Sequence, residues 1–221
     1  MSEEKQEIRK SPSERRTVMY TIIRVIAFIV FHTICPVVYH GKEKLRQKGP
    51  YILISNHFSN WDPLVNGSPI RQEIIFLGKK ELMKSPLIRW IFRSVRMIPV
   101  DRHNTDMTAM RNCFKALKEE EILVIYPEGT RHHEGIMEKT ESGIATIALR
   151  QNVPVVPMLI DSKVRPFHVT HVYVGEDIPT ADLRETGINK QTCQLFMERM
   201  QETYRTMIRE KETHGQVDYK H

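Results

Sequence analysis

His57 and Asp62 lie five residues apart, shortly after the apolar run Tyr51 to Ser55. On one continuous helix, side chains at this spacing would lie roughly 140° apart and would not meet. The two side chains can therefore pair only if the chain turns between them, and Ser59 and Asn60 favour such a turn. In that arrangement the carboxylate would hold one imidazole nitrogen and leave the other to accept a proton, as in general-base catalysis.

The same residues also have a purely structural interpretation. An aspartate followed by Pro63 is typical of a helix N-cap and a first helical residue. A lone histidine near a strand end often serves packing. Both interpretations place His57 at the tip of a strand and begin a helix at Asp62, so this spacing alone does not establish catalysis.

A second group of chemically capable residues follows the apolar run Ile122 to Tyr126. At the carboxyl edge of an open α/β sheet, where ligands bind, Gly129 would let the backbone approach a ligand closely. Thr130 offers a hydroxyl group, and Arg131 offers a planar fork suited to two phosphate oxygens. Glu128 would repel a phosphate, so we assign it to a substrate hydroxyl or to holding the arginine. An ordinary turn with a surface arginine is the alternative.

Two more cations follow short apolar runs. Lys79 lies just beyond the run Ile74 to Leu77, and Arg102 follows the run around residues 98–100. Both are expected to project from the same sheet edge as His57.

Short apolar runs alternate with amphipathic stretches after residue 50. Runs that are nearly continuous, as in strands covered on both faces, occur at residues 51–54, 74–77, 122–126 and 153–160. Apolar residues recur at helical spacing from Met107 to Leu117 and from Cys193 to Met207. We predict an α/β fold with a mixed, largely parallel sheet flanked by helices.

The composition favours one catalytic domain with an anionic partner. The 221 residues are 40% hydrophobic, enough for a core, and carry a net charge of +6. The three cysteines, Cys35, Cys113 and Cys193, are far apart, so neither a disulfide framework nor a zinc knuckle is indicated. Positive charge alone would also suit a nonenzymatic membrane or nucleic-acid binder, but the basic residues alternate with acids and no nucleic-acid motif is present.

The segment from Thr17 to Val38 is strongly apolar. As a helix it would extend roughly 33 Å, about the thickness of a hydrocarbon core. Arg24 and His32 interrupt it, and Pro36 is expected to end or kink it.

Basic residues lie on both sides of this segment, at 15–16 and within 42–48. A single span would place only one flank on the cytoplasmic side, where such residues prefer to lie. We therefore predict a monotopic anchor on the cytoplasmic face of an anionic membrane, in an N-terminal part, residues 1–40, that precedes a catalytic domain, residues 41–221. A helix packed on the protein's own core is the alternative.

Together these blocks resemble the 1-acylglycerol-3-phosphate acyltransferase family in order and spacing. The matching blocks, between about residues 37 and 174, are Asn56-His57-x4-Asp62, Lys79-x-Glu81-Leu82-x3-Pro86 with Arg102, Glu128-Gly129-Thr130-Arg131, and Val153-Pro154-Val155-Val156-Pro157. The resemblance implies a glycerol-3-phosphate acyltransferase-like fold. It also implies acyl transfer from acyl carrier protein or coenzyme A to the sn-2 hydroxyl of lysophosphatidic acid, with no metal, prosthetic group or nucleic acid.

The resemblance assigns a role to each matching residue. His57 would be the base and Asp62 its orienting partner. Arg131, with Gly129 and Thr130, would bind the glycerol phosphate, helped by Lys79 and Arg102. The block 153–157 would support the acyl channel.

This chain departs from the family pattern at three places. Arg89 and Arg96 stand where glycine is usual, and His132-His133 stand where a serine is common. Bulky cations could change the acyl channel or the acceptor. Another lysophospholipid or a glycolipid acceptor therefore stays open, as does a metal hydrolase that uses His57, Asp62 and the two adjacent histidines.

Overall fold

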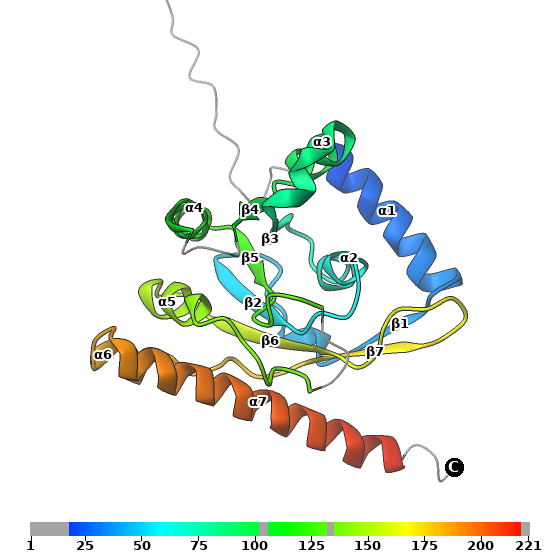
Figure 1. Cartoon of the computed structure of the whole chain (residues 1–221). Helices are drawn as coiled ribbons and strands as arrows, with labels where there is room; N and C mark the ends of the chain where they lie inside the picture. Colours follow the sequence, from blue (N-terminus) through cyan, green and yellow to red (C-terminus); the bar gives the residue numbers. More distant parts are fainter. Residues whose placement is uncertain (1–17, 102–105, 132–134, 218–221) are drawn as a thin grey trace, which may run out of the picture.

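Seven strands form one sheet in the computed structural model, which describes residues 18–101, 106–131 and 135–217. The strand order is β1-β7-β6-β2-β5-β3-β4 (Figure 1). Every neighbouring pair is parallel except β6 and β7, which are antiparallel. The predicted mixed, largely parallel sheet is confirmed.

The strands are β1 (Val37–His40), β2 (Tyr51–Ser55), β3 (Ile74–Lys79), β4 (Ile98–Val100), β5 (Ile122–Ile125), β6 (Val155–Ile160) and β7 (Thr170–Val174). The α-helices are α1 (Val18–Thr33), α2 (Asp62–Gly67), α3 (Pro86–Ser94), α4 (Met107–Lys118), α5 (Gly143–Arg150), α6 (Ala181–Glu185) and α7 (Lys190–Val217). Two short 3-10 helices, η2 (Lys42–Lys44) and η3 (Lys80–Lys84), complete the described elements.

Successive residues of the central strands contribute to two different cores. In β2, Ile52 and Ile54 pack with α4, α5 and α7, whereas Tyr51 and Leu53 pack with α1 and α2. This follows from the two-residue period of a strand, and it explains why β2 is apolar at nearly every position. The sheet is therefore covered on both faces (Figure 1).

The N-terminal apolar segment is not one long helix. Helix α1 ends at Thr33, three residues before Pro36, and the last apolar residues form β1, which pairs with β7. The helix thus ends before Pro36, as expected, whereas the strand over residues 37–40 at the sheet edge was not expected from the sequence. The described part of the chain contains no helix that is both long enough and apolar enough to cross a membrane.

Helix α1 has two apolar faces. Tyr20, Ala27 and Phe31 are buried in the core that α2 and one face of the sheet also line, so the alternative of packing on the protein's own core holds for this face. On the opposite face large apolar side chains stay exposed, among them Val25 and Ile29, at 54% and 53%.

Candidate active site

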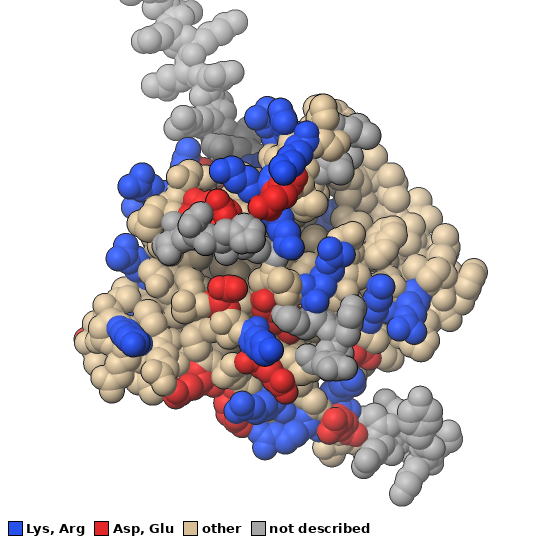
Figure 2. Space-filling view, in the orientation of Figure 1, with Lys and Arg blue, Asp and Glu red and all other residues tan. Residues whose placement is uncertain are grey.

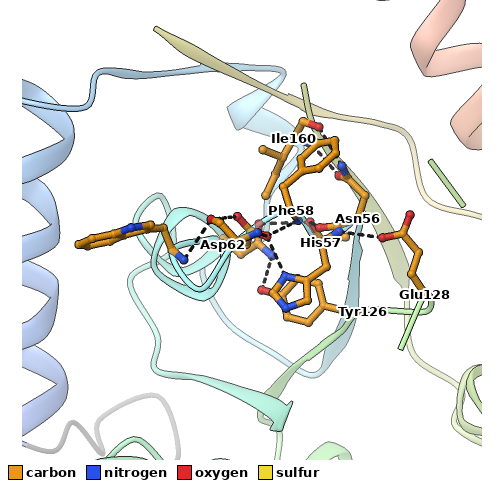
Figure 3. Close-up of polar contacts among 11 residues, drawn as sticks. Asn56, His57, Phe58, Asp62, Tyr126, Glu128 and Ile160 are labelled. Atoms are coloured by element: carbon orange, nitrogen blue, oxygen red, sulfur yellow. Dashed lines mark hydrogen bonds and ion pairs between the residues drawn. The ribbon is translucent and has the colours of Figure 1, made fainter. Parts of the chain in front are cut away.

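His57 and Asp62 form the pair that their spacing predicted. Nδ1 of His57 lies 2.7 Å from Oδ2 of Asp62 (Figure 3). His57 follows β2 and Asp62 begins α2, so the turn between strand and helix brings them together. The aspartate side chain is 0% exposed and the histidine side chain 16%. The carboxylate is thus sequestered, while the imidazole stays accessible to a substrate.

Four donors surround the Asp62 carboxylate. Oδ2 also accepts hydrogen bonds of 2.7 Å from the backbone N–H groups of Phe58 and Ser59, and Oδ1 accepts one of 2.8 Å from the Ser59 hydroxyl. These donors fix the orientation of the carboxylate toward His57. Ser59, which the sequence analysis treated only as a turn former, therefore belongs to the site.

The N-cap interpretation of Asp62 is wrong. The residue that caps α2 is Trp61, without a side-chain hydrogen bond, and Asp62 is already helical. Its carboxylate points back to the turn and binds the N–H groups before the helix.

Tyr126 supports the other side of the histidine. Its ring stacks on the His57 imidazole with centroids 4.3 Å apart and planes inclined by 25° (Figure 3). Its hydroxyl accepts a 3.0 Å hydrogen bond from Nδ2 of Asn66. Burial, and then the charge of Asp62, raise the pKa of the Tyr126 phenol well above its usual range, so the phenol stays protonated. The sequence does not indicate this contact, because the tyrosine follows a different strand, β5.

Glu128 connects two loops. It follows β5, the neighbour of β2, and its Oε2 accepts a 2.9 Å hydrogen bond from the backbone N–H of His57, 71 residues away (Figure 3). Its Oε1 accepts another, also 2.9 Å, from the N–H of Met137. The buried carboxylate thus holds the backbone of the candidate base.

Two anchors fix the ends of the strands beneath the site. Asn56 exchanges two hydrogen bonds with the backbone of Ile160, at 2.9 and 2.8 Å, and so ties the end of β2 to the end of β6. The Tyr204 hydroxyl on α7 donates to the carbonyls of Ile54 and Met158 at 2.7 and 3.2 Å. The position of His57 is therefore set by three strands and one distant helix.

The candidate phosphate-binding residues lie at this carboxyl edge. Lys79 is the exposed last residue of β3, and Thr130 and Arg131 are exposed beyond β5. Gly129 is buried with a φ of 64°, a conformation that favours glycine. Arg102 lies outside the described residues.

The two arginines Arg89 and Arg96 lie in different parts of the fold. Arg96 has a φ of 54°, in the left-handed region, and its guanidinium lies 2.6 Å from the buried carboxylate of Glu121. Both residues precede strands, so this pair lies at the amino edge of the sheet, opposite His57. Arg89 donates to the carbonyl of Met83 at 2.8 Å.

The metal-hydrolase alternative depends on His132 and His133, which lie outside the described residues. Within the described ranges, no group of three or more His, Cys, Asp and Glu side chains could hold a metal ion. The donors that are placed, His57 and Asp62, instead bind one another.

A histidine accessible to substrate and held by a buried carboxylate defines a candidate general-base site on an α/β sheet. The family model described as "Acyltransferase" matches residues 36–161, a range that contains His57, Asp62 and Glu128. The chain therefore belongs to the acyltransferase family.

Relatives with assigned names agree with this membership. The chain is 28% identical to the 1-acyl-sn-glycerol-3-phosphate acyltransferase of Streptococcus pneumoniae, over 67% of this chain and 56% of the relative. It is 33% identical to the Bacillus subtilis protein of the same name, over 53% of this chain and 59% of the relative. The chain thus spans somewhat more than half the length of these relatives.

A solved structure shares the fold. The 1-acyl-sn-glycerophosphate (LPA) acyltransferase PlsC from Thermotoga maritima superposes with a TM-score of 0.61 at 20% identity. The alignment covers 84% of this chain and 77% of that one.

Proposed function

We propose that this protein is an enzyme that transfers an acyl chain from acyl carrier protein or acyl-coenzyme A to the sn-2 hydroxyl of 1-acyl-sn-glycerol-3-phosphate. The product is phosphatidic acid, for phospholipid biosynthesis. The observation that carries the proposal is the 2.7 Å contact between His57 and the buried carboxylate of Asp62. The names of the relatives supply the acceptor and the reaction.

The pair suits proton transfer in both halves of the reaction. Asp62 holds Nδ1, so Nε2 of His57 faces the acceptor and accepts its hydroxyl proton. The acceptor oxygen then attacks the thioester carbonyl, and the carbon–sulfur bond breaks. The imidazolium, stabilised by the carboxylate, returns the proton to the leaving thiolate, and no cofactor takes part.

The acceptor phosphate calls for fixed cations. By analogy with phosphorylated side chains it carries about −1.5 to −2 charges at neutral pH. Arg131 and Lys79, at the same sheet edge as His57, are suited to bind it, and we retain Arg102 as a third candidate. Gly129 and Thr130 would let the backbone and a hydroxyl approach the headgroup. We reassign Glu128 from substrate binding to positioning, because its two oxygens bind backbone N–H groups.

We also propose that the protein works on the cytoplasmic face of an anionic membrane. The exposed apolar face of α1 would enter one leaflet, and the basic residues beside it would meet the headgroups. A lipid acceptor could then keep its tail in the bilayer while its headgroup reaches His57.

The direct test is thiol release by the purified full chain with each donor. The acceptors are lysophosphatidic acid, lysophosphatidylcholine and monoacylglycerol. We expect release that requires an acceptor and is fastest with lysophosphatidic acid. A preference for lysophosphatidylcholine would reject the proposed acceptor but keep acyl transfer, and acceptor-independent release would indicate a thioesterase.

The phosphate assignment has its own test. Arg131→Ala should raise the KM for lysophosphatidic acid by about 10- to 100-fold, because charge-assisted hydrogen bonds contribute about 1.5–3 kcal/mol. The kcat should change little. Arg205→Ala on α7 is the matched control, and an equal KM for both variants would exclude Arg131 from the phosphate site.

A further inference from the structure

The connection between β6 and β7, residues 161–169, carries an exposed aromatic residue at a tight turn. Phe167 is 88% exposed and has a φ of 59°, in the left-handed region. The N–H of His168 donates to the carbonyl of Arg165 at 3.3 Å and closes the turn. A left-handed bulky residue is an outlier, and its exposure also costs free energy, so this conformation requires support from its surroundings.

That support comes from the end of α1. The N–H of Phe167 donates to the carbonyl of Ile34 at 2.6 Å, and the N–H of Thr170 donates to that of Pro36 at 2.9 Å. Ile34 is itself 43% exposed and follows α1 directly. An exposed aromatic residue is therefore bound, through its backbone, to the exposed apolar residue that follows α1. Figure 1 shows the β6–β7 loop beside that end of α1.

Basic residues border this apolar surface. Lys163, Arg165 and His168 are exposed on the same loop. Figure 2 shows a broad uncharged area where Figure 1 draws α1, with blue side chains below it where the loop lies. An aromatic tip between cations matches the boundary of an anionic bilayer, where rings lie at headgroup depth. A second copy of the chain would bring the same cations against each other, which disfavours self-association here.

The loop is also connected to the catalytic edge. It begins at Asp161, directly after Ile160, whose backbone is bound to Asn56, the neighbour of His57. Strands β6 and β2 are parallel, so the loop and His57 leave the sheet at the same edge.

We propose that the loop 161–169 is a second membrane contact, in which Phe167 enters the headgroup region of an anionic bilayer beside α1. A loop contact added at one end of α1 would fix the rotation of the protein on the membrane and turn the carboxyl edge of the sheet toward its lipid substrate. The inference rests on the proposed function, because a lipid acceptor is what makes this orientation useful.

Binding of the full chain to vesicles is the first test. Phe167→Gly accepts the left-handed conformation and should fold at least as well as the wild type. Loss of the aromatic side chain that would enter the bilayer should weaken partition into phosphatidylglycerol-containing vesicles about tenfold. Phe167→Trp should restore it, and Leu195→Ala on α7 should match the wild type. Unchanged partition of Phe167→Gly would overturn the proposal.

An environment-sensitive fluorophore on the loop shows whether the loop contacts a bilayer or a second copy of the chain. It is attached at Phe167→Cys in a Cys193→Ser background, since Cys35 and Cys113 are buried. A blue shift on anionic vesicles, absent for the same probe at Leu195→Cys, supports the proposal. A blue shift that instead follows protein concentration without vesicles would assign the surface to a second copy. Binding without any blue shift would leave α1 as the membrane contact and reject the loop. Absence of vesicle binding in the wild type would reject both the loop contact and the proposed membrane location, while the thiol-release assay still reports on acyl transfer.

Discussion

The phenol ring of Tyr126 lies against the imidazole of His57, with ring centroids 4.3 Å apart. Tyr126 thus supports the face of the imidazole, while Asp62 binds Nδ1 at its edge. Tyr126→Phe keeps the stacked ring and loses only the hydrogen bond with Asn66. Tyr126→Leu loses the stacking as well. Because an aromatic pair contributes about 0.5–1.5 kcal/mol, we expect Tyr126→Leu to lower kcat about three- to tenfold relative to Tyr126→Phe. The KM for the acceptor should be the same in both. Equal kcat values would show that stacking does not position the base.

Substitution of Glu128 tests whether this residue positions His57 or binds the substrate. In Glu128→Gln the amide keeps one acceptor oxygen, but its NH2 group would face a backbone N–H of His57 or Met137. We expect kcat to fall about 10- to 100-fold, because leaving a buried N–H without its acceptor costs about 1–3 kcal/mol and misplaces the histidine. Steady-state kinetics with varied acceptor give the answer. A rise in KM at constant kcat would return Glu128 to the substrate-binding residues.

The pair of Arg96 and Glu121 predicts an unusual order of stabilities. Arg96→Ala leaves a buried carboxylate without its cation, a loss of about 3–5 kcal/mol. Arg96→Gly loses the same pair but relieves the strain of the left-handed backbone. Its free energy of unfolding should therefore exceed that of Arg96→Ala by about 1 kcal/mol, and it should unfold at a higher urea concentration. Specific activity of the folded variants should stay near that of the wild type, since the pair lies at the opposite sheet edge from His57. An alanine variant at least as stable as the glycine variant would contradict this.

Asp182 and Arg199 give a pH-dependent stability. Two hydrogen bonds of 2.8 and 2.7 Å join α6 to α7, and the guanidinium lowers the pKa of Asp182 from 3.8 to about 2. The pKa of Asp182 is lower in the folded state than in the unfolded state. The contribution of this ion pair to stability is therefore present above pH 3.8 and is lost as the pH falls toward about 2. Urea midpoints of the wild type and Asp182→Asn should therefore differ at neutral pH and converge in acid. A difference that grows in acid would contradict this sign.

Much of the sheet could be predicted from the sequence because its central strands are covered on both faces. The four strands with continuous apolar runs, β2, β3, β5 and β6, were all predicted. Strand β7 was not, because its burial alternates along the strand. Strand β1 was hidden in the apolar run after α1, where periodicity does not separate a helix end from a short strand.

The site could be predicted only where its partners are near in sequence. The pairing of His57 with Asp62 depends on one turn, and residues in that turn favour it. The stacking of Tyr126 and the backbone bond to Glu128 depend on β5 lying next to β2, which no local pattern specifies. The left-handed conformation of Arg96 likewise became evident only in the structure, since no local pattern specifies it.

The most direct test of the central claim is the turnover of His57→Ala beside His40→Ala, an exposed histidine of β1 that serves as the matched control. Acceptor-dependent thiol release is measured at saturating lysophosphatidic acid and donor, with folding checked by circular dichroism. A general base typically contributes about 10² to 10⁴ in rate, so we predict at least this loss for His57→Ala and no loss for His40→Ala. Wild-type turnover by a folded His57→Ala protein would contradict the account of this site.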